Sequence, residues 1–263
     1  MEPEVNVPKI LIAILTTHER NGWASKEVAD FLATLPHWAN KRYMWQHTFA
    51  HNFIPAAGAR NTIAKSFKES GADWILMIDN DMAPPINLLD AIQDAPEDAG
   101  VVVPKFYRWD ETASSLMLCW GLDLPNAPSA STTQNGHRMA VIENKFYELS
   151  TCGTGCVFVR PEVFQKVPEP WFFYSFDEMK AMTASEDINF CKKIREHGIK
   201  IYGNGKFLVG HHHTVNLAVL TALLYDKAEA KPSFETAERP SPVSVDGGAS
   251  LPISHQQELD ALA

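Results

Sequence analysis

Two aspartates stand at the end of an apolar segment, where they could bind a divalent cation. Residues 74–78 are apolar, and Asp79, Asn80 and Asp81 follow them directly, before a turn rich in proline. Such a run is typical of a buried strand, and strands of open α/β sheets carry functional residues at their carboxyl ends. Side chains at positions i and i+2 of an extended segment point the same way, so Asp79 and Asp81 could converge on Mg²⁺ or Mn²⁺. The alternative is a turn in which the aspartates only cap the next element.

Two later groups of residues could complete such a site. His211, His212 and His213 follow a short apolar segment, and alternation along an extended chain would place the first and third on one face. Glu186 and Asp187 begin an expected helix, where the helix dipole favours negative charge and a carboxylate could take a proton from an attacking hydroxyl. The alternatives are a surface histidine cluster and a simple helix cap.

Composition limits the class of protein. The chain has 263 residues, of which 45% are hydrophobic and 21% charged, enough apolar content for one substantial core. Its formal net charge is −9, whereas a dedicated nucleic-acid-binding protein carries an excess of basic residues. No apolar run has the length of a membrane span, and the acidic residues within positions 1–9 are unlike a secretory leader, which predicts a cytoplasmic location. The four cysteines show no CxxC spacing and are expected to be reduced.

Strands and helices are expected to alternate over the first hundred residues, as in a parallel α/β sheet. The second half is expected to contain short β pieces around a polar insert at residues 126–137. A helix following Ser185 should bury a stripe formed by Ile188, Cys191 and Ile194. Strands are expected at residues 9–15, 74–78, 101–104, 116–120, 139–142, 146–149, 156–159, 199–202 and 207–209, and helices at 25–35, 59–70, 87–93, 161–166 and 185–197.

Five short motifs follow one another between Lys9 and Val215. They are Ala59-Arg60-Asn61; Asp73 to Met82; Gly153-Thr154-Gly155 with Arg160 to Phe164; Ser185-Glu186-Asp187 with Phe190-Cys191; and Gly210-His211. Their order resembles that in GT-A fold glycosyltransferases, in particular family 2-like forms seen in bacteria and their phages. The resemblance implies a Rossmann-like nucleotide-diphospho-sugar transferase fold, with a mixed sheet flanked by helices.

The resemblance also implies a metal site. Family members bind Mn²⁺ or Mg²⁺ through the D-x-D aspartates, so it assigns Asp79 and Asp81 to the metal, and Asp79 and Asn80 to the diphosphate or ribose of the donor. The metal would stabilise the departing nucleoside diphosphate. The Gly-His motif implies His211 as a further ligand with His213 in reserve, and the sequence leaves open which of the three histidines binds.

Other roles follow from the same resemblance. Donor contacts are implied for the end of the first strand and the A-R-N motif, at Thr16, Thr17, Glu19 and Arg60. Asp187 matches the general base of inverting members, with Glu186 beside it, although retaining relatives share this motif layout. An acceptor pocket is implied at Gly153, Thr154, Gly155 and Trp171, because glycine lets backbone approach a sugar and an aromatic ring can stack on it.

The sequence thus predicts a metal-dependent glycosyltransferase that moves a sugar from a nucleotide-diphosphate donor to an acceptor hydroxyl. We expect one domain over residues 1–227, with a nucleotide-binding half at about 9–104 and an acceptor half at about 105–215, and a disordered Pro-, Ser- and Glu-rich tail at 228–263. The alternatives are a noncatalytic nucleotide-sugar binding module and an enzyme that glycosylates hydroxymethylated bases of phage DNA. Acidity favours a saccharide, glycan or metabolite acceptor over long nucleic acid.

Overall fold

The computed structural model describes residues 7–16, 24–39, 42–51, 56–110, 115–122 and 142–213. All of them belong to one compact unit, Met1–Asn216. Thr17, Glu19, the polar insert at 126–137, all but the last residue of the strand expected at 139–142, and the expected tail at 228–263 lie outside the described residues. The boundary at residue 227 and the disorder of the tail therefore stay predictions.

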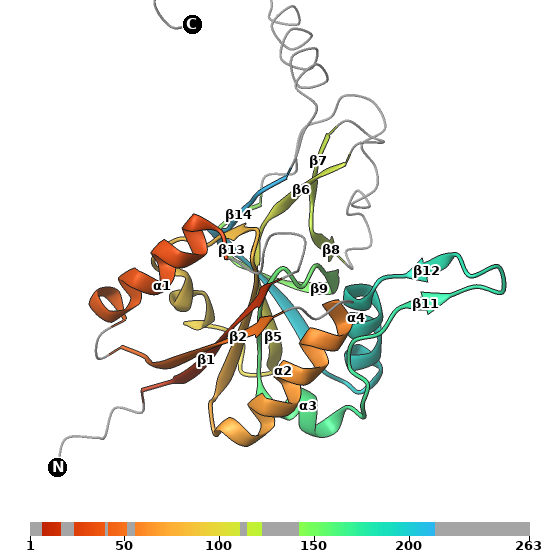
Figure 1. The fold of residues 1–263 in the computed structure, drawn as a ribbon, viewed down its shortest axis with the longest axis horizontal. Helices are drawn as coiled ribbons and strands as arrows, with labels where there is room; N and C mark the ends of the chain where they lie inside the picture. The colour runs from red at the N-terminus through yellow and green to blue at the C-terminus, as the bar shows by residue number, and fades with distance from the viewer. Residues whose placement is uncertain are drawn as a thin grey trace, which may run out of the picture. The chain divides into compact units, whose positions relative to one another are not determined.

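Eight strands of the described residues form one mixed sheet, in the order β2-β1-β3-β10-β5-β13-β9-β8 (Figure 1). In that order they are β2 (Met44–His51), β1 (Lys9–Thr16), β3 (Trp74–Asp79), β10 (Cys156–Val159), β5 (Ala99–Lys105), β13 (Lys200–Leu208), β9 (Phe146–Cys152) and β8 (Trp120–Leu122). β1 is parallel to β2 and β3, and β5 is parallel to β13. β10 lies between β3 and β5 and is antiparallel to both. The expected mixed α/β sheet is confirmed.

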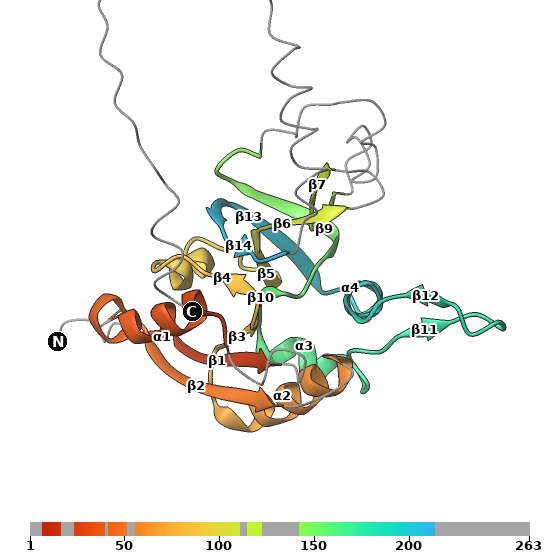
Figure 2. The same ribbon diagram turned by 45° about the horizontal axis from the view of Figure 1, so that its top comes forward.

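Helices cover both faces of this sheet, which explains the continuous apolar runs of its central strands. α1 (Lys26–Trp38) lies on one face, and α2 (Ala56–Ser70) and α3 (Pro161–Lys166) lie on the other (Figures 1 and 2). α4 (Glu186–Glu196) packs against β9 and β13, and the short 3₁₀ helix η2 (Leu88–Ile92) packs against β5 and β13. Within the described residues, no helix combines the length and apolar character needed to cross a membrane.

Three two-stranded ribbons stand beside the sheet. β4 (Met82–Ala83) pairs with β14 (Gly210–His211), and β6 (Tyr107–Asp110) pairs with β7 (Ser115–Leu118). β11 (Ser175–Phe176) pairs with β12 (Met182–Ala184) in a hairpin that projects from the body (Figure 1). The first ribbon joins the D-x-D turn to the histidine segment.

The sequence-based element predictions were wrong at several places: the short strands of β4, β6, β11, β12 and β14 were not expected, and the strand expected at 116–120 is divided between β7 and β8. Three further differences are informative. β2 was not expected, because its residues alternate between aromatic and polar instead of forming an apolar run. The two strands expected at 199–202 and 207–209 are one continuous strand, β13. Ile188 is 40% exposed, and Asn189 and Phe190 are buried on α4 in its place, since the buried face begins one position later.

Candidate functional site

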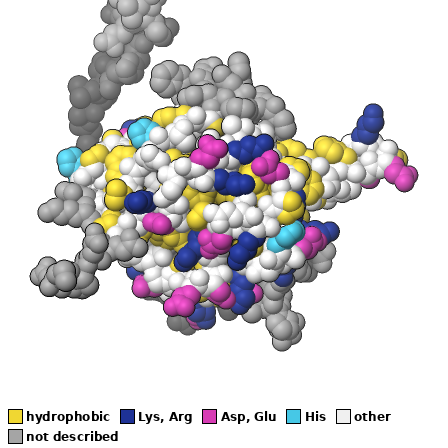
Figure 3. Space-filling model, turned by 90° about the horizontal axis from the view of Figure 1, so that it is seen from below, with side chains coloured by type: hydrophobic (Ala, Val, Ile, Leu, Met, Phe, Trp, Pro, Cys, Tyr) yellow, Lys and Arg dark blue, Asp and Glu magenta, His cyan; other side chains and the backbone are white. Residues whose placement is uncertain are grey.

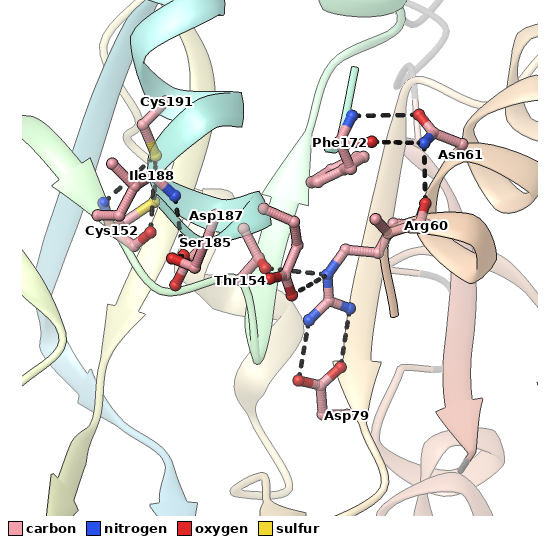
Figure 4. A network of polar contacts seen from close by, with 12 residues as sticks. Arg60, Asn61, Asp79, Cys152, Thr154, Phe172, Ser185, Asp187, Ile188 and Cys191 are labelled. Carbon is pink, nitrogen blue, oxygen red and sulfur yellow. Dashed lines mark hydrogen bonds and ion pairs between the residues drawn. The ribbon is translucent and has the colours of Figure 1, made fainter. Parts of the chain in front are cut away.

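A buried arginine joins three of the sequence motifs (Figure 4). Arg60 on α2 is 3% exposed and pairs bidentately with Asp79 at the end of β3, with both N–O distances at 2.9 Å. Its Nε donates to Thr154 Oγ1 at 3.0 Å and lies 3.9 Å from Glu186 Oε1. Burial alone would lower the pKa of Arg60, but the charges of Asp79 and Glu186 raise it above its ordinary value. Arg60 is therefore a fixed cation between two carboxylates.

A glycine lets this network close around Asp79. The backbone N–H of Asp79 donates to the Gly155 carbonyl at 2.8 Å. A Cβ added at Gly155 would lie 3.2 Å from Met82 Sδ and 3.5 Å from Asp79 Oδ2. The first of these contacts is tight, so an alanine at this position would press on the Met82 side chain, whereas the second is an ordinary van der Waals contact. The G-T-G motif thus packs against the D-x-D turn in this structure, and Thr154 is buried there.

The two acidic residues that begin α4 have different surroundings. Glu186 faces the network, where it accepts a hydrogen bond from the Tyr174 hydroxyl. Burial, with a contribution from Glu186, raises the pKa of Tyr174 to about 12. The phenol therefore stays protonated and acts as a donor. Asp187 Oδ1 accepts the Ile188 N–H at 2.8 Å and the Ser185 hydroxyl. Among the residues drawn in Figure 4, Asp187 bonds to these two and not to Arg60. Asp187 is partly exposed, which leaves its carboxylate accessible to a ligand.

The second aspartate of the D-x-D motif faces a histidine. The β4–β14 pairing places His211 opposite Met82, and the His212 N–H donates to the Asp81 carbonyl at 2.8 Å. His211 Nε2 lies 3.6 Å from Asp81 Oδ2, and His211 Nδ1 donates to the Tyr107 carbonyl at 3.2 Å. Contact with Asp81 raises the pKa of His211 above its ordinary value, although burial opposes this.

The three histidines separate as alternation predicts. The rings of His211 and His213 lie edge to face with centroids 6.0 Å apart. His212 points elsewhere, with its Nε2 at 3.0 Å from Glu27 Oε2 on α1. His211 and His213 therefore share a side of the chain near Asp81, and His212 links the segment to α1.

The donor set beside Asp81 suits a divalent cation that is bound together with substrate. The described part of the chain holds no ready group of three or more His, Cys, Asp or Glu side chains for a metal. Magnesium-type sites commonly use one or two protein ligands and complete the shell with phosphates and water. The Nδ1–H of His211 is held by a backbone carbonyl, the arrangement that leaves Nε2 free as a ligand. Asp81 and His211 fit this role, whereas both oxygens of Asp79 are engaged by Arg60.

Two of the expected donor contacts are buried. Thr16 ends β1 and its hydroxyl donates to the Ala50 carbonyl at 3.3 Å. Asn80 is also buried, and its backbone bonds to Leu15 and Ser25, which fixes the D-x-D turn between β1 and the start of α1. These residues shape the turn from within. Thr17 and Glu19 lie outside the described residues.

The structure does not offer Trp171 to an acceptor, which corrects the sequence-based expectation. Its side chain is 1% exposed, its ring packs edge-on against Phe164 at 5.1 Å, and its Nε1 donates to the Val167 carbonyl at 2.7 Å. An aromatic ring so enclosed cannot stack on a sugar. Gly153 also packs inward, since a Cβ there would lie 3.0 Å from the Phe106 ring.

Two asparagines to which the sequence analysis assigned no role hold the base of the hairpin. Asn61 accepts the N–H groups of Trp171 and Phe172 at 3.0 and 3.1 Å and donates to the Phe172 carbonyl at 2.7 Å (Figure 4). Asn189 donates to the Phe173 and Ala184 carbonyls at 2.8 and 3.4 Å. The sequence could have indicated them through their positions, because Asn61 directly follows Arg60 and Asn189 lies two residues after Asp187.

Several solved structures are similar to this chain. A197 from STIV matches over 78% of this chain and 86% of its own, with 17% identity and a TM-score of 0.51. GalNAc-T7, solved with UDP, GalNAc and Mn²⁺, matches over 81% of this chain and 45% of its own, with 13% identity and a TM-score of 0.44. A Drosophila β1,4-galactosyltransferase 7 mutant, solved with manganese, UDP-Gal and xylobiose, matches over 92% of this chain and 84% of its own, with 15% identity and a TM-score of 0.42. No protein-family model and no curated protein matches the sequence. The similarity to A197 shows a shared fold and does not specify a reaction.

Proposed function

We propose that the chain is a metal-dependent glycosyltransferase that moves a sugar from a nucleotide-diphosphate donor to an acceptor hydroxyl. One observation carries the proposal: Arg60 pairs with Asp79 and contacts Glu186, while Asp81 lies beside His211, and Asp187 bonds to Ser185 and to the Ile188 N–H. This arrangement supplies a pair of cation ligands and a separate carboxylate that can act as a base. The order of the five sequence motifs supports the same function.

Asp81 and His211 would hold Mn²⁺ or Mg²⁺ together with the diphosphate of the donor. When bound, the cation would neutralise charge on the departing nucleoside diphosphate. His211 serves as a ligand only when its Nε2 is unprotonated, and the hydrogen bond from Nδ1 to Tyr107 favours that tautomer. His213 stands beside His211 as a second candidate for the same role.

Asp187 would act as the general base of an inverting transfer. Its Oδ1 is fixed by Ser185 and by the Ile188 N–H, so the other oxygen is oriented to take the proton of the acceptor hydroxyl. The acceptor oxygen then bonds to the anomeric carbon of the donor sugar as the bond from that carbon to the phosphate oxygen breaks. Arg60 takes no proton in this scheme and positions Asp79, Glu186 and Thr154.

The division of labour along the chain follows from these roles. The donor side would come from residues 9–104, which supply the D-x-D turn and Arg60. The acceptor side would come from residues 105–215, which supply the Gly153–Gly155 backbone and Asp187. His211 would reach back from the second half to the donor side through the β4–β14 ribbon.

A thermal-shift panel of nucleoside diphosphates and nucleotide sugars tests the donor site. The panel is run with Mn²⁺, with Mg²⁺ and with chelator, on the wild type and on Asp81→Ala. We expect one nucleotide to raise Tm only when metal is present, because a ligand that binds only the folded state stabilises it. Asp81→Ala should abolish this shift.

The control is Asp30→Ala, since Asp30 pairs with Lys26 on the exposed surface of α1. It should leave the nucleotide-dependent shift unchanged. A shift that survives both chelator and Asp81→Ala would contradict a metal-dependent site, and so would the lack of any nucleotide-dependent shift.

A further inference from the structure

The hairpin formed by residues 175–184, here called the arm, connects directly to the proposed catalytic carboxylates. Its outgoing strand β11 follows Tyr174, which bonds to Glu186, and its returning strand β12 ends two residues before Glu186. Met182 lies five residues before Asp187, so their Cα atoms are at most about 18 Å apart. A ligand larger than one sugar ring could contact both the arm and Asp187.

The base of the arm is fixed to the body by hydrogen bonds from two helices. Asn189 of α4 donates to backbone carbonyls on both sides of the base, and the Ser175 hydroxyl bonds to its Oδ1 at 3.2 Å. Asn61 of α2 holds the preceding residue Phe172, whose ring stacks on Phe190 at 4.3 Å. The arm is therefore an oriented part of the site.

The arm exposes an apolar surface. Phe176 and Met182 are cross-strand partners that are 60% and 58% exposed, and Met179 near the tip is 87% exposed. They are three of the nine large hydrophobic side chains that the described part of the chain exposes. Figure 3 shows the arm projecting from the body, with hydrophobic atoms along its stem and charged groups toward its tip. Exposed apolar groups gathered on a short ribbon are typical of a binding surface.

Charge helps to identify the occupant. The arm carries Asp177, Glu178 and Lys180 and therefore has a net charge of −1. A polyanion such as DNA would gain no phosphate contacts from it beyond one lysine. A hydrocarbon group would cover Phe176 and Met182 without burying any of these charges.

We propose that the arm binds an apolar group carried by the acceptor, so that the acceptor is a hydroxyl compound joined to a hydrocarbon chain and not a free sugar or a nucleic acid. This inference rests on the proposed glycosyltransferase function. The sugar end of the acceptor would lie at Asp187, and the chain would follow the arm along Phe176 and Met182. The arm thus selects the class of acceptor.

Methionine methyl NMR of the full chain tests this contact. The probes are octyl β-glucoside, kept below its critical micelle concentration, and glucose. We expect octyl glucoside to shift the methyl signals of Met179 and Met182, and glucose to leave them unchanged. Met44 is a matched reference, because it is 55% exposed on β2, remote in sequence from the arm.

Substitutions then measure the contribution of the arm. Met182→Gln should weaken octyl glucoside binding about tenfold, because it removes most of one apolar side-chain contact. Met44→Gln should leave the affinity unchanged. Equal shifts at Met44, or an unchanged affinity in Met182→Gln, would overturn the inference. A protein-concentration dependence of the Met182 signal without probe would identify a second copy as the occupant and also overturn it.

The two proposals fail in different ways. If no nucleotide stabilises the wild type, the proposed function itself fails, whatever the arm binds. If a nucleotide does stabilise it and octyl glucoside does not contact the arm, only the inference about the acceptor fails. Binding of the arm to phosphatidylcholine vesicles without any response to monomeric octyl glucoside would assign it to a membrane surface instead, and would overturn the inference.

Discussion

In each acidic motif of the site, one residue, here called inward, contacts the buried Arg60, and the other, here called outward, has different partners. Asp79 and Glu186 both contact Arg60, whereas Asp81 meets His211, and Asp187 bonds to Ser185 and to the Ile188 N–H. Asp79 and Asp81 are two residues apart, and Glu186 and Asp187 are adjacent. One buried cation therefore separates carboxylates that the sequence presents as pairs.

The division assigns different physical tasks to similar side chains. A fully buried guanidinium is costly unless its charge is neutralised, so the inward carboxylates are needed to keep Arg60 in place. The outward carboxylates contact His211, Ser185 and the Ile188 N–H instead of Arg60, and we expect them to bind a metal or a substrate. Substitution of inward residues should therefore lower stability, and substitution of outward residues should lower function.

The largest expected effect is on turnover, at an outward residue. Asp187→Asn should reduce release of nucleoside diphosphate from the stabilising donor by about 10² to 10⁴-fold, because the general base is lost. Donor affinity and Tm should stay near the wild-type values, since the amide oxygen still accepts the Ile188 N–H. Steady-state kinetics and the nucleotide thermal shift measure the two quantities.

The matched control for that substitution is Glu186→Gln. It should lower Tm, because it removes a charge beside Arg60. If the wild type shows no turnover, and both variants bind the donor with the wild-type affinity, the protein is a binding module and not an enzyme.

The next effect is on stability, at an inward residue. Asp79→Asn should lower the free energy of unfolding by about 3 kcal/mol, because it leaves the buried Arg60 without its bidentate partner. Asp81→Asn should change it by less than about 1 kcal/mol, as is usual for a partly exposed ion pair. Urea unfolding of the two variants, with chelator present, compares them directly. Equal losses would remove the distinction between the two aspartates.

Much of the fold could be predicted from the sequence because its signals are local. The apolar run at 74–78 and the turn after it located β3, and Ser185 and Gly198 located the limits of α4. β2 could not be recognised, since it is an edge strand stabilised by pairing with β1 instead of by an apolar run of its own. Local pattern does not reveal such long-range pairing.

The site was predictable in its residue types and only in part in their roles. The alternation rule separated His211 and His213 from His212, since it depends on neighbouring residues alone. The same rule grouped Asp79 with Asp81. It could not account for Arg60, which belongs to α2 and pairs with Asp79 in the fold. Trp171 is buried for a similar reason: Phe164, which covers its ring, belongs to α3.

A smaller effect on stability is expected at Asn61, which neighbours Arg60 in the sequence and holds the base of the hairpin through uncharged hydrogen bonds. Asn61→Ala should cost about 2 kcal/mol of unfolding free energy, because the N–H groups of Trp171 and Phe172 lose their acceptor. Thr62→Ala is the control, since Thr62 is on the exposed side of the same helix and its hydroxyl donates to the Gly58 carbonyl within that helix. It should cost less than about 0.5 kcal/mol. Similar losses in the two variants would show that Asn61 does not fix the hairpin base.

The smallest expected effect is on the pH dependence of stability, through the contact of the outward residue Asp81 with His211. The pKa of His211 is raised in the folded protein by Asp81, so protonated His211 stabilises the fold. This contribution is fully present below the unfolded-state pKa of about 6.5 and is lost as pH rises through the folded-state pKa. In chelator, the stability advantage of wild type over His211→Gln should therefore be larger at pH 5.5 than at pH 9. Adding Asp81→Asn to both proteins should weaken the pH dependence of the difference, because the main group that raises the pKa of His211 is gone. If the stability difference between wild type and His211→Gln is the same at pH 5.5 and pH 9, His211 and Asp81 are not coupled. That result would also contradict the proposal that the two residues bind a cation together.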